Sequence, residues 1–188
     1  MLNGGTMATA DAIGAGIHPE TLYRMERDGI LEKISRGLYR LADQPDPSHP
    51  DFFVISRKMP NGVICLISAL AFHEITTQIP HRMDVAIKRG MRPGKIDYPP
   101  VRYYYFSNSS FISGVEEHII DGNQTRIYSP EKTLADCFKF RNKIGIDTAI
   151  EALKLYIERK NASVEKILKY AKICRVKNIM LPYLEVVL

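Results

Sequence analysis

Polar and hydrophobic positions follow helical spacing in a short segment near the N-terminus, residues 18–28. At about 100° per residue, Leu22 and Met25 point to one side of the predicted helix. His18 is suited to the N-cap, and Pro19 is suited to the first helical position, where its missing N–H costs nothing. The opposite, exposed side of this helix carries Glu20, Tyr23, Arg24 and Arg27.

Two stretches with strand character follow this helix, residues 31–35 and 38–41. Arg36 and Gly37 lie between them, and Gly37 supplies the positive φ that a tight hairpin requires. A helix followed by a hairpin is typical of a winged helix-turn-helix, which lays the helix in the major groove and the hairpin along the phosphate backbone. The pattern therefore predicts a DNA-binding module.

The segment before this module is short. Thr6 or Thr9 is predicted to cap a helix that runs through Ala15 and ends at Gly16. Only five residues precede Thr6, so the first helix of a winged domain is predicted to be short or missing.

A proline-rich spacer, residues 45–50, separates this module from the rest of the chain, because proline neither continues a strand nor sits inside a helix. The spacer predicts two domains, residues 1–44 and residues 45–188. In the second domain, residues 63–75 are strongly apolar and predict a buried helix, although the first of them also suit a strand. Segments rich in β-branched or aromatic residues then predict a small sheet over about 83–128. They are residues 83–88, 101–107, 115–121 and 124–128.

The chain from about residue 129 to residue 188 is predicted to be helical. Ser129, Asp147 and Ser163 each begin a helical stretch, and residues 176–188 form a last helical or irregular piece. The predicted fold class is α+β, with an N-terminal winged helix-turn-helix followed by a larger mixed α/β domain that has a small sheet and C-terminal helices.

The distribution of charge changes this picture. The net charge of +5 fits a nucleic-acid binder. However, residues 1–46 hold five Lys/Arg against seven Asp/Glu, a balance of −2. Residues 129–188 hold twelve Lys/Arg against seven Asp/Glu, a balance of +5. The predicted DNA-binding module is therefore slightly acidic, and the positive charge is concentrated at the C-terminus.

The candidate DNA contacts lie on the exposed helix face and on the hairpin. Arginine reads guanine edges or holds phosphates, tyrosine contacts a phosphate or a thymine methyl group, and glutamate accepts from a cytosine amino group. Periodicity alone describes a solvated helix face equally well, and the cations of the hairpin favour DNA binding. The candidates are His18, Glu20, Thr21, Tyr23, Arg24 and Arg27 on the helix and Lys33, Arg36 and Arg40 on the hairpin.

A second basic surface is predicted on the C-terminal helices, where cations are interleaved with apolar residues. For any single one of them, a solvated face of a packed helix is the ordinary interpretation. As a group they can form a second DNA-contacting surface that compensates for the acidic module. These residues are Lys154, Arg159, Lys160, Lys166, Lys169, Lys172, Arg175 and Lys177.

Enzymatic chemistry finds little support in the sequence. The histidines have no partners at metal-ligand spacing, and no cysteine has a suggestively placed histidine. A nuclease needs clustered carboxylates, and the candidates in the predicted sheet region follow no persuasive pattern. These candidates are Asp84, Asp97, Glu116 and Glu117. We therefore expect no catalytic residue, no metal and no cofactor.

The compartment is predicted from the cysteines and from what the chain lacks. Cys65, Cys137 and Cys174 are far apart in apolar surroundings, which is typical of buried thiols in a reducing cytosol. No stretch approaches the roughly 18 apolar residues of a membrane span, and the N-terminus lacks the features of a secretory signal. We expect a cytoplasmic protein.

Three motifs in order resemble the AbiEi family of antitoxins. The first comprises Gly16 and Ile17 with the helix and hairpin segments that follow, LYRM (22–25), GIL (29–31) and RGLYRL (36–41). The second is SALAFH (68–73), and the third is SPEKTLAD (129–136) at the start of the C-terminal helices. Each motif is weak alone, whereas the ordered set, which spans roughly the whole chain, is fairly specific.

The resemblance implies a non-enzymatic antitoxin that represses a bacterial abortive-infection, or type IV toxin–antitoxin, operon. The winged helix would bind inverted repeats in the operon's own promoter, as a monomer or a dimer. The C-terminal domain would counter a nucleotidyltransferase-like toxin, with or without direct contact, and would help to bind DNA. Two alternatives stay open on the residues alone: a nucleic-acid-processing enzyme with an N-terminal targeting module, and a one-component regulator that senses a small ligand.

Overall fold

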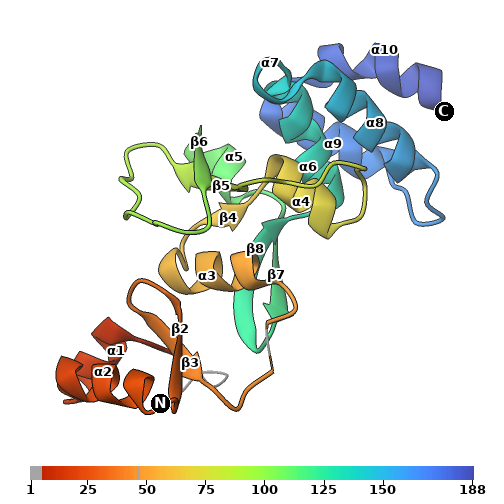
Figure 1. The fold of residues 1–188 in the computed structure, drawn as a ribbon. Helices are drawn as coiled ribbons and strands as arrows, with labels where there is room; N and C mark the ends of the chain where they lie inside the picture. The colour runs from red at the N-terminus through yellow and green to blue at the C-terminus, as the bar shows by residue number, and fades with distance from the viewer. Residues whose placement is uncertain (1–5, 46) are drawn as a thin grey trace. The chain divides into compact units, whose positions relative to one another are not determined.

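The computed structural model describes residues 6–45 and 47–188, with a mixed α/β fold that contains two small sheets (Figure 1). The chain forms two compact units. The first comprises the described residues up to Pro60 together with Gly94–Pro100 and His118–Thr125. The second comprises Asn61–Pro93, Val101–Glu117 and Arg126–Leu188. No helix among the described residues is long and apolar enough to cross a membrane.

Helices and an antiparallel sheet build the first unit. The sheet has the order β1-β3-β2, so β3 is its central strand. The elements are β1 (Thr6–Ala8), α1 (Thr9–Gly14), α2 (Pro19–Arg27), β2 (Leu31–Ser35), β3 (Leu38–Leu41) and α3 (Pro50–Lys58).

The predicted helix and hairpin are confirmed. His18 is the N-cap of α2, and its Nδ1 accepts a hydrogen bond from the Glu20 N–H at 3.3 Å. On the inner side of α2, Leu22 is buried in one core cluster with Ala12, Leu31 and Tyr39. The hairpin strands β2 and β3 have the predicted bounds, and Gly37 between them has φ +74°.

The first element of the chain differs from the prediction. Thr6 lies in strand β1, paired with Arg40 of β3, and does not cap a helix. The N-cap of α1 is Ala8, which makes no side-chain cap hydrogen bond, and Thr9 is already helical. A three-residue strand carries too little local pattern to reveal itself, and its pairing with a strand some thirty residues later decides its conformation.

Helix α3 belongs to the first unit, whereas the predicted boundary at residue 44 placed it in the larger domain. Phe53 and Val54 of α3 form a core cluster with Leu38 of β3. The other face of β3 is also covered, because Tyr39 packs in the cluster that contains Leu22 of α2. Both faces of the central strand are therefore buried. The boundary itself stays a prediction.

A mixed five-stranded sheet of order β6-β5-β4-β8-β7 runs through the second unit. Strand β4 pairs antiparallel with β5 and parallel with β8, and β5 pairs parallel with β6. Strand β4 begins the segment for which a buried helix was predicted over residues 63–75. The helix there covers only Leu66–Phe72, and its first residues, 63 and 64, form a strand. The strands are β4 (Val63–Ile64), β5 (Met83–Lys88), β6 (Val101–Phe106), β7 (Val115–Ile120) and β8 (Asn123–Tyr128), with the tip of the β7–β8 hairpin counted in the first unit.

Helices make up the rest of the second unit, and α6 is packed against α4, α8, α9 and α10 (Figure 1). The helix predicted from Ser129 is confirmed, with Ser129 as its N-cap and Lys139 as its last residue. The last segment, predicted to be helical or irregular, is a helix. The bounds are α4 (Leu66–Phe72), α5 (Asn108–Ile112), α6 (Pro130–Lys139), α7 (Arg141–Ile144), α8 (Ile146–Ile157), α9 (Val164–Cys174) and α10 (Lys177–Val187).

Charged side chains are buried at the centre of the second unit. Lys132 Nζ forms an ion pair with Asp136 Oδ2 one turn along α6, and both side chains are fully buried. The ammonium group also lies 4.0 Å from the centroid of the Tyr128 ring. Asp136 Oδ1 accepts a hydrogen bond from the Cys174 thiol at 3.2 Å. Burial raises the pKa of Asp136, and the charge of Lys132 opposes that shift.

The three cysteines are free and buried, as predicted. Burial raises the pKa of each thiol, so that Cys174, for example, has a pKa of about 12. These thiols therefore stay protonated at neutral pH and act as small apolar side chains.

Candidate nucleic-acid interface

The outer face of α2 presents an exposed row of polar and charged side chains. Tyr23, Arg24 and Arg27 are exposed, and Tyr23 keeps 55% of its surface accessible. Glu20 and His18 are exposed at the start of the helix, and Thr21 is partly buried. The structure thus brings the predicted helix residues onto one accessible surface, opposite the buried Leu22.

Two of the three predicted hairpin cations are accessible. Lys33 is exposed on β2. Arg36 at the turn keeps 82% of its side chain accessible, and a carboxylate oxygen of Asp97 lies 4.0 Å from its guanidinium group. At that distance and exposure the ion pair holds Arg36 only weakly. Both cations are therefore available to a phosphate backbone.

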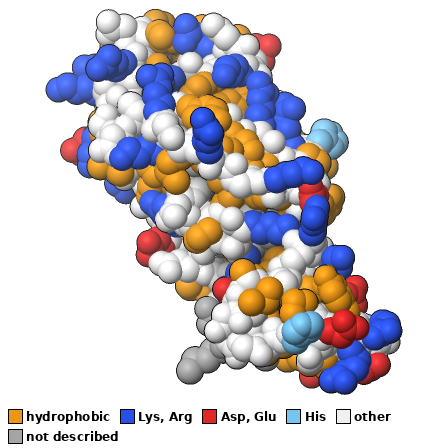
Figure 2. All heavy atoms as spheres, turned by 90° about the vertical axis from the view of Figure 1, so that its left-hand side faces the viewer, with side chains coloured by type: hydrophobic (Ala, Val, Ile, Leu, Met, Phe, Trp, Pro, Cys, Tyr) orange, Lys and Arg blue, Asp and Glu red, His pale blue; other side chains and the backbone are white. Residues whose placement is uncertain are grey.

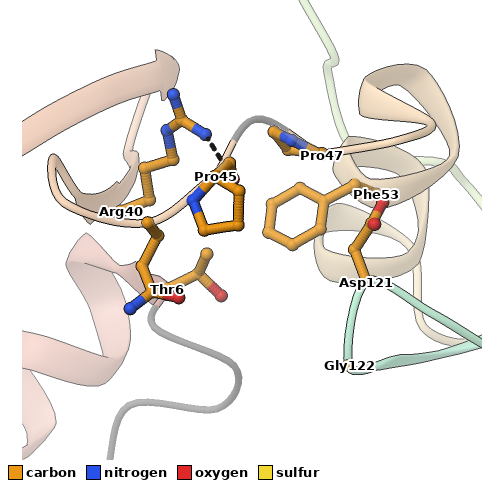
Figure 3. Close-up of a pocket in the computed structure, with 8 residues that line it drawn as sticks. Thr6, Arg40, Pro45, Pro47, Phe53, Asp121 and Gly122 are labelled. Carbon is orange, nitrogen blue, oxygen red and sulfur yellow. Dashed lines mark hydrogen bonds between the residues drawn. The ribbon is translucent and has the colours of Figure 1, made fainter.

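The third hairpin cation, Arg40, was predicted to be available to DNA, and that placement is wrong. Its side chain is only 9% exposed, and its Nε and Nη2 donate to Glu32 Oε2 at 2.9 and 2.5 Å. Its Nη1 donates to the carbonyl oxygen of Pro45 at 3.0 Å (Figure 3). Arg40 lies on the central strand β3, and its charge is used inside the first unit.

A pocket of about 300 Å³ lies beside Arg40 in the first unit. Figure 3 shows the Arg40 side chain, the Pro45 and Pro47 rings and the Phe53 ring around it. Its wall also contains Thr6, Gln44, Asp121 and Gly122. The guanidinium group of Arg40 already donates hydrogen bonds to Glu32 and Pro45. The pocket therefore offers little positive charge that could bind a ligand.

Asp121 on the wall of this pocket is also committed to the fold. Its carboxylate accepts hydrogen bonds from the Ser48 N–H and hydroxyl, at 3.1 and 2.9 Å, and from the His49 N–H at 3.3 Å. Partial burial works to raise the pKa of Asp121, but the hydrogen bonds from Ser48 and His49 outweigh it and the pKa is lowered. The carboxylate therefore holds the two residues that lead into α3 and places a negative charge near its N-terminus, where His49, the N-cap residue, makes no side-chain cap bond.

The inner side of α2 opens on a second pocket, of about 310 Å³. It is mainly apolar, and α1, α2 and all three strands contribute to its wall. The lining residues are Met7, Asp11, Ala15, Ile17, Met25, Leu31 and Leu41.

Most of the predicted C-terminal cations are exposed, and one of them is used internally. Arg159, just after α8, donates from Nη2 to the carbonyl oxygens of His73 and Glu74, at 2.5 and 2.8 Å. One of its amino groups satisfies the end of α4, and its place on a basic surface stays a prediction. The exposed members are Lys154, Lys160, Lys166, Lys169, Lys172, Arg175 and Lys177.

A further group of cations was missed by the sequence analysis. Arg102 of β6 and Lys143 of α7 lie over the Tyr104 ring, with their charged atoms 5.2 and 5.7 Å from its centroid. Lys139 and Lys143 lie 5.9 and 5.8 Å from the centroid of Phe140. Lysine and arginine next to aromatic residues in sequence, in RYYYF (102–106) and KFRNK (139–143), are the signal that could have revealed this group.

The carboxylates that a nuclease would need are not gathered into a metal site within the described ranges. Asp84 is buried on β5, whereas Asp97 is exposed and pairs with Lys95 at 3.2 Å. Glu116 and Glu117 are exposed neighbours on β7, so their side chains point to opposite faces of the sheet. The geometry that the nuclease hypothesis required is absent from this part of the chain.

Comparisons with known proteins address the N-terminal module and the fold. Residues 3–42 match the profile of the family described as "Transcriptional regulator, AbiEi antitoxin". No curated protein sequence matches the chain. Among solved structures, the Rv2827c protein from Mycobacterium tuberculosis is similar, with a TM-score of 0.53 and 13% sequence identity over 96% of this chain and 75% of that chain.

The identity to Rv2827c is low enough that this likeness concerns the fold alone. The family match covers α1, α2 and the hairpin, which are the elements that carry the first predicted motif. Over residues 3–42, the sequence therefore matches the family of AbiEi antitoxin transcriptional regulators, as the first motif predicted.

Proposed function

We propose that this protein is an antitoxin that represses its own operon by binding promoter DNA through a winged helix formed by α1, α2 and the β2–β3 hairpin. The carrying observation is the joint exposure of Tyr23, Arg24 and Arg27 on α2 with Lys33 and Arg36 on the hairpin, inside the segment that matches the AbiEi profile. In this arrangement α2 enters the major groove, and the hairpin follows the backbone.

Each exposed side chain has a distinct part in this proposal. Arg24 and Arg27 bind guanine edges or phosphates, and both lie on the face of α2 that points away from the core. Tyr23 and Thr21 offer hydroxyl groups, and His18 and Glu20 stand at the end of the helix that first approaches the bases. Lys33 and Arg36 contact phosphates and fix the register without reading sequence.

The second unit has the antitoxin role in this proposal and counters a nucleotidyltransferase-like toxin, with or without contact. Its exposed C-terminal cations, from Lys154 to Lys177 but without Arg159, extend the contact with DNA. This assignment rests on their exposure and on the +5 balance of residues 129–188.

Fluorescence anisotropy with the duplex upstream of the protein's own gene tests the repressor part. We expect the double variant Arg24→Ala, Arg27→Ala to lose about tenfold or more in affinity, because each arginine contact is worth about 1–3 kcal/mol. The matched control, Lys58→Ala with Lys95→Ala, removes two cations from the same unit away from α2. Equal affinities of the two double variants would overturn the assignment of the α2 face.

Co-expression tests the antitoxin part. If the reading frame next to this gene encodes a nucleotidyltransferase-like toxin, growth arrest by that toxin should be relieved by the full chain. Relief that persists in the Arg24→Ala, Arg27→Ala variant would separate the antitoxin role from operator binding. Continued arrest in the presence of well-expressed, folded protein would contradict the proposal.

A further inference from the structure

Three cations in the second unit rest on one aromatic platform. Arg102, Lys139 and Lys143 lie over the rings of Tyr104, Phe106 and Phe140, and we call these six residues the cation–aromatic cluster. The rings are themselves packed edge to face, because Phe140 contacts Tyr104 at 5.1 Å and Phe106 at 5.3 Å between centroids. The cations are therefore held by a rigid base and lose little freedom when they bind an anion.

The cations of this cluster form no ion pair within the part of the chain that the structure describes. Among the described residues, no carboxylate lies within ion-pair distance of Arg102, Lys139 or Lys143. This separates them from Arg40, whose guanidinium is paired with Glu32, and from Arg159, which caps α4.

Two buried acids act electrostatically on the cluster, Asp84 on Arg102 and Asp136 on Lys139. Burial raises the pKa of Asp84 to about 6, and the charges of Arg82 and Arg102 work to lower it. Arg102 is therefore partly balanced by a buried charge. Lys139 is likewise partly balanced by Asp136, so Lys143 carries most of the free positive charge. Both lysines lie within 6 Å of the centroid of the same Phe140 ring.

The rings add something that a plain basic patch lacks. Phe140 is only partly buried and carries a cation on each side of it in sequence, at positions 139 and 143. Figure 2, which faces the side of β6, shows Lys and Arg side chains of the second unit around a group of hydrophobic ones. Tyr104 and Phe106 are buried beneath Phe140, so Phe140 is the ring of the cluster that a base can reach. Cations next to an accessible aromatic ring are the combination that binds phosphates while a base stacks.

We infer that the cation–aromatic cluster is a binding surface for single-stranded nucleic acid. Lys139, Lys143 and Arg102 hold consecutive phosphates, and a base stacks on Phe140. Duplex DNA hides its base faces and would leave the ring unused, and the Asp and Glu side chains of an acidic peptide have no aromatic ring to stack on it. The inference is independent of operator binding by α2.

Anisotropy with a labelled oligoadenylate of about 12 nucleotides, within the ~4–16 nucleotides that single-strand sites cover, tests this surface. The charge-reversal pair Lys139→Glu, Lys143→Glu should weaken binding about tenfold or more. The matched pair Arg89→Glu, Arg92→Glu, which makes the same charge change on exposed residues of the same unit that belong to neither proposed surface, should change it less than about twofold. Equal losses in the two pairs would overturn the inference.

Phe140→Leu separates stacking from charge. It should weaken oligoadenylate binding about fivefold or more, the lower end of what one base–aromatic stack contributes, and leave inorganic polyphosphate binding unchanged. Because Phe140 also packs on Tyr104 and Phe106, Phe140→Tyr serves as a variant that keeps the ring, and it should retain binding. If Phe140→Leu binds oligoadenylate as tightly as Phe140→Tyr, the ring is not part of the site.

Competing partners are outcomes of the same titrations. Tighter binding of a duplex of equal length, or of polyglutamate, with the same dependence on Lys139 and Lys143 would overturn the inference in favour of duplex DNA or an acidic protein. The Arg24→Ala, Arg27→Ala variant should still bind oligoadenylate. Loss of operator binding alone in that variant would leave this inference standing, so the two proposals fail separately.

Discussion

Helices α2 and α6 begin with nearly the same signal and end in opposite environments. Each has a side-chain cap, a proline at the first position and a glutamate after it, His18-Pro19-Glu20 in α2 and Ser129-Pro130-Glu131 in α6. In α2 the charged residues face solvent, whereas in α6 the residues from Glu131 to Asp136 are all buried. The local signal sets where a helix starts, and the surrounding elements decide whether its charges can meet a partner.

The ion pair of α6 should show the largest effect of this contrast. Asp136→Ala leaves Lys132 buried without its partner and should cost about 3–5 kcal/mol of unfolding free energy, measured by urea denaturation. Arg24→Ala on the exposed face of α2 should change stability by less than about 0.5 kcal/mol.

A double variant tests whether the loss comes from the unpaired charge of Lys132. Replacing the pair together, Lys132→Met with Asp136→Leu, should recover most of the lost stability, since well-packed apolar residues often match a buried ion pair. If the double variant is as unstable as Asp136→Ala, the loss comes from packing and not from an uncompensated charge.

Gly114 should be the next most sensitive position. It has φ +70°, and a Cβ there would meet Lys132 Cβ at 2.6 Å and Cγ at 2.8 Å. Gly114→Ala should cost about 2 kcal/mol or more, because the added methyl overpacks the fully buried stem of Lys132. Gly37→Ala, where the nearest atom is Thr9 Oγ1 at 3.7 Å, tests backbone strain alone and should cost less. A larger loss at Gly37 would show that the buried stem yields easily.

The buried Asp84 predicts a dependence on pH. Because burial raises its pKa from 3.8 to about 6, the protonated form stabilises the folded state, fully below about pH 3.8. That contribution is lost as the pH rises through about 6. The difference in melting temperature between Asp84→Asn and the unchanged protein should therefore grow in favour of the variant between about pH 4 and pH 7. A difference that is constant over this range would contradict the buried, raised-pKa carboxyl group.

The two helix caps should give the smallest effects. The buried Ser129 hydroxyl accepts from the Lys132 N–H, and Ser129→Ala should cost about 1 kcal/mol. His18→Ala, which removes the exposed cap of α2, should lower the free energy of unfolding by less than Ser129→Ala does. Hydrogen exchange of the first-turn amides of each helix reads the two losses separately, and a larger loss at His18 would reverse the comparison.

The predictable parts of the structure are those with local causes. The cap of α2, the turn glycine at Gly37 and the period-two pattern of residues 31–35 and 38–41 lie within a few residues of what they determine, and the structure confirms them. The α2 residues named as candidates are accessible for the same reason, because helical periodicity separates an inner from an outer face.

The unpredicted parts have distant causes. Arg40 was expected to be accessible because a hairpin usually has an open face, but α2 and α3 cover both faces of β3. Lys132 and Asp136 resemble an ordinary surface pair at i,i+4, and only the packing of α4, α8 and α9 around α6 buries them. The cation–aromatic cluster joins β6 to α7 across some forty residues, which no local pattern records.

The burial of Arg40 has a thermodynamic consequence for DNA binding. Of the five cations in residues 1–46, Arg40 is neutralised by Glu32, so four remain to displace counterions from a duplex. Each phosphate contact contributes about −0.9 to the slope of log affinity against log salt, which limits this segment to a slope of about −4. A measured slope much steeper than this would have to come from cations elsewhere in the chain. The excess over about −4 would then give the number of additional phosphate contacts.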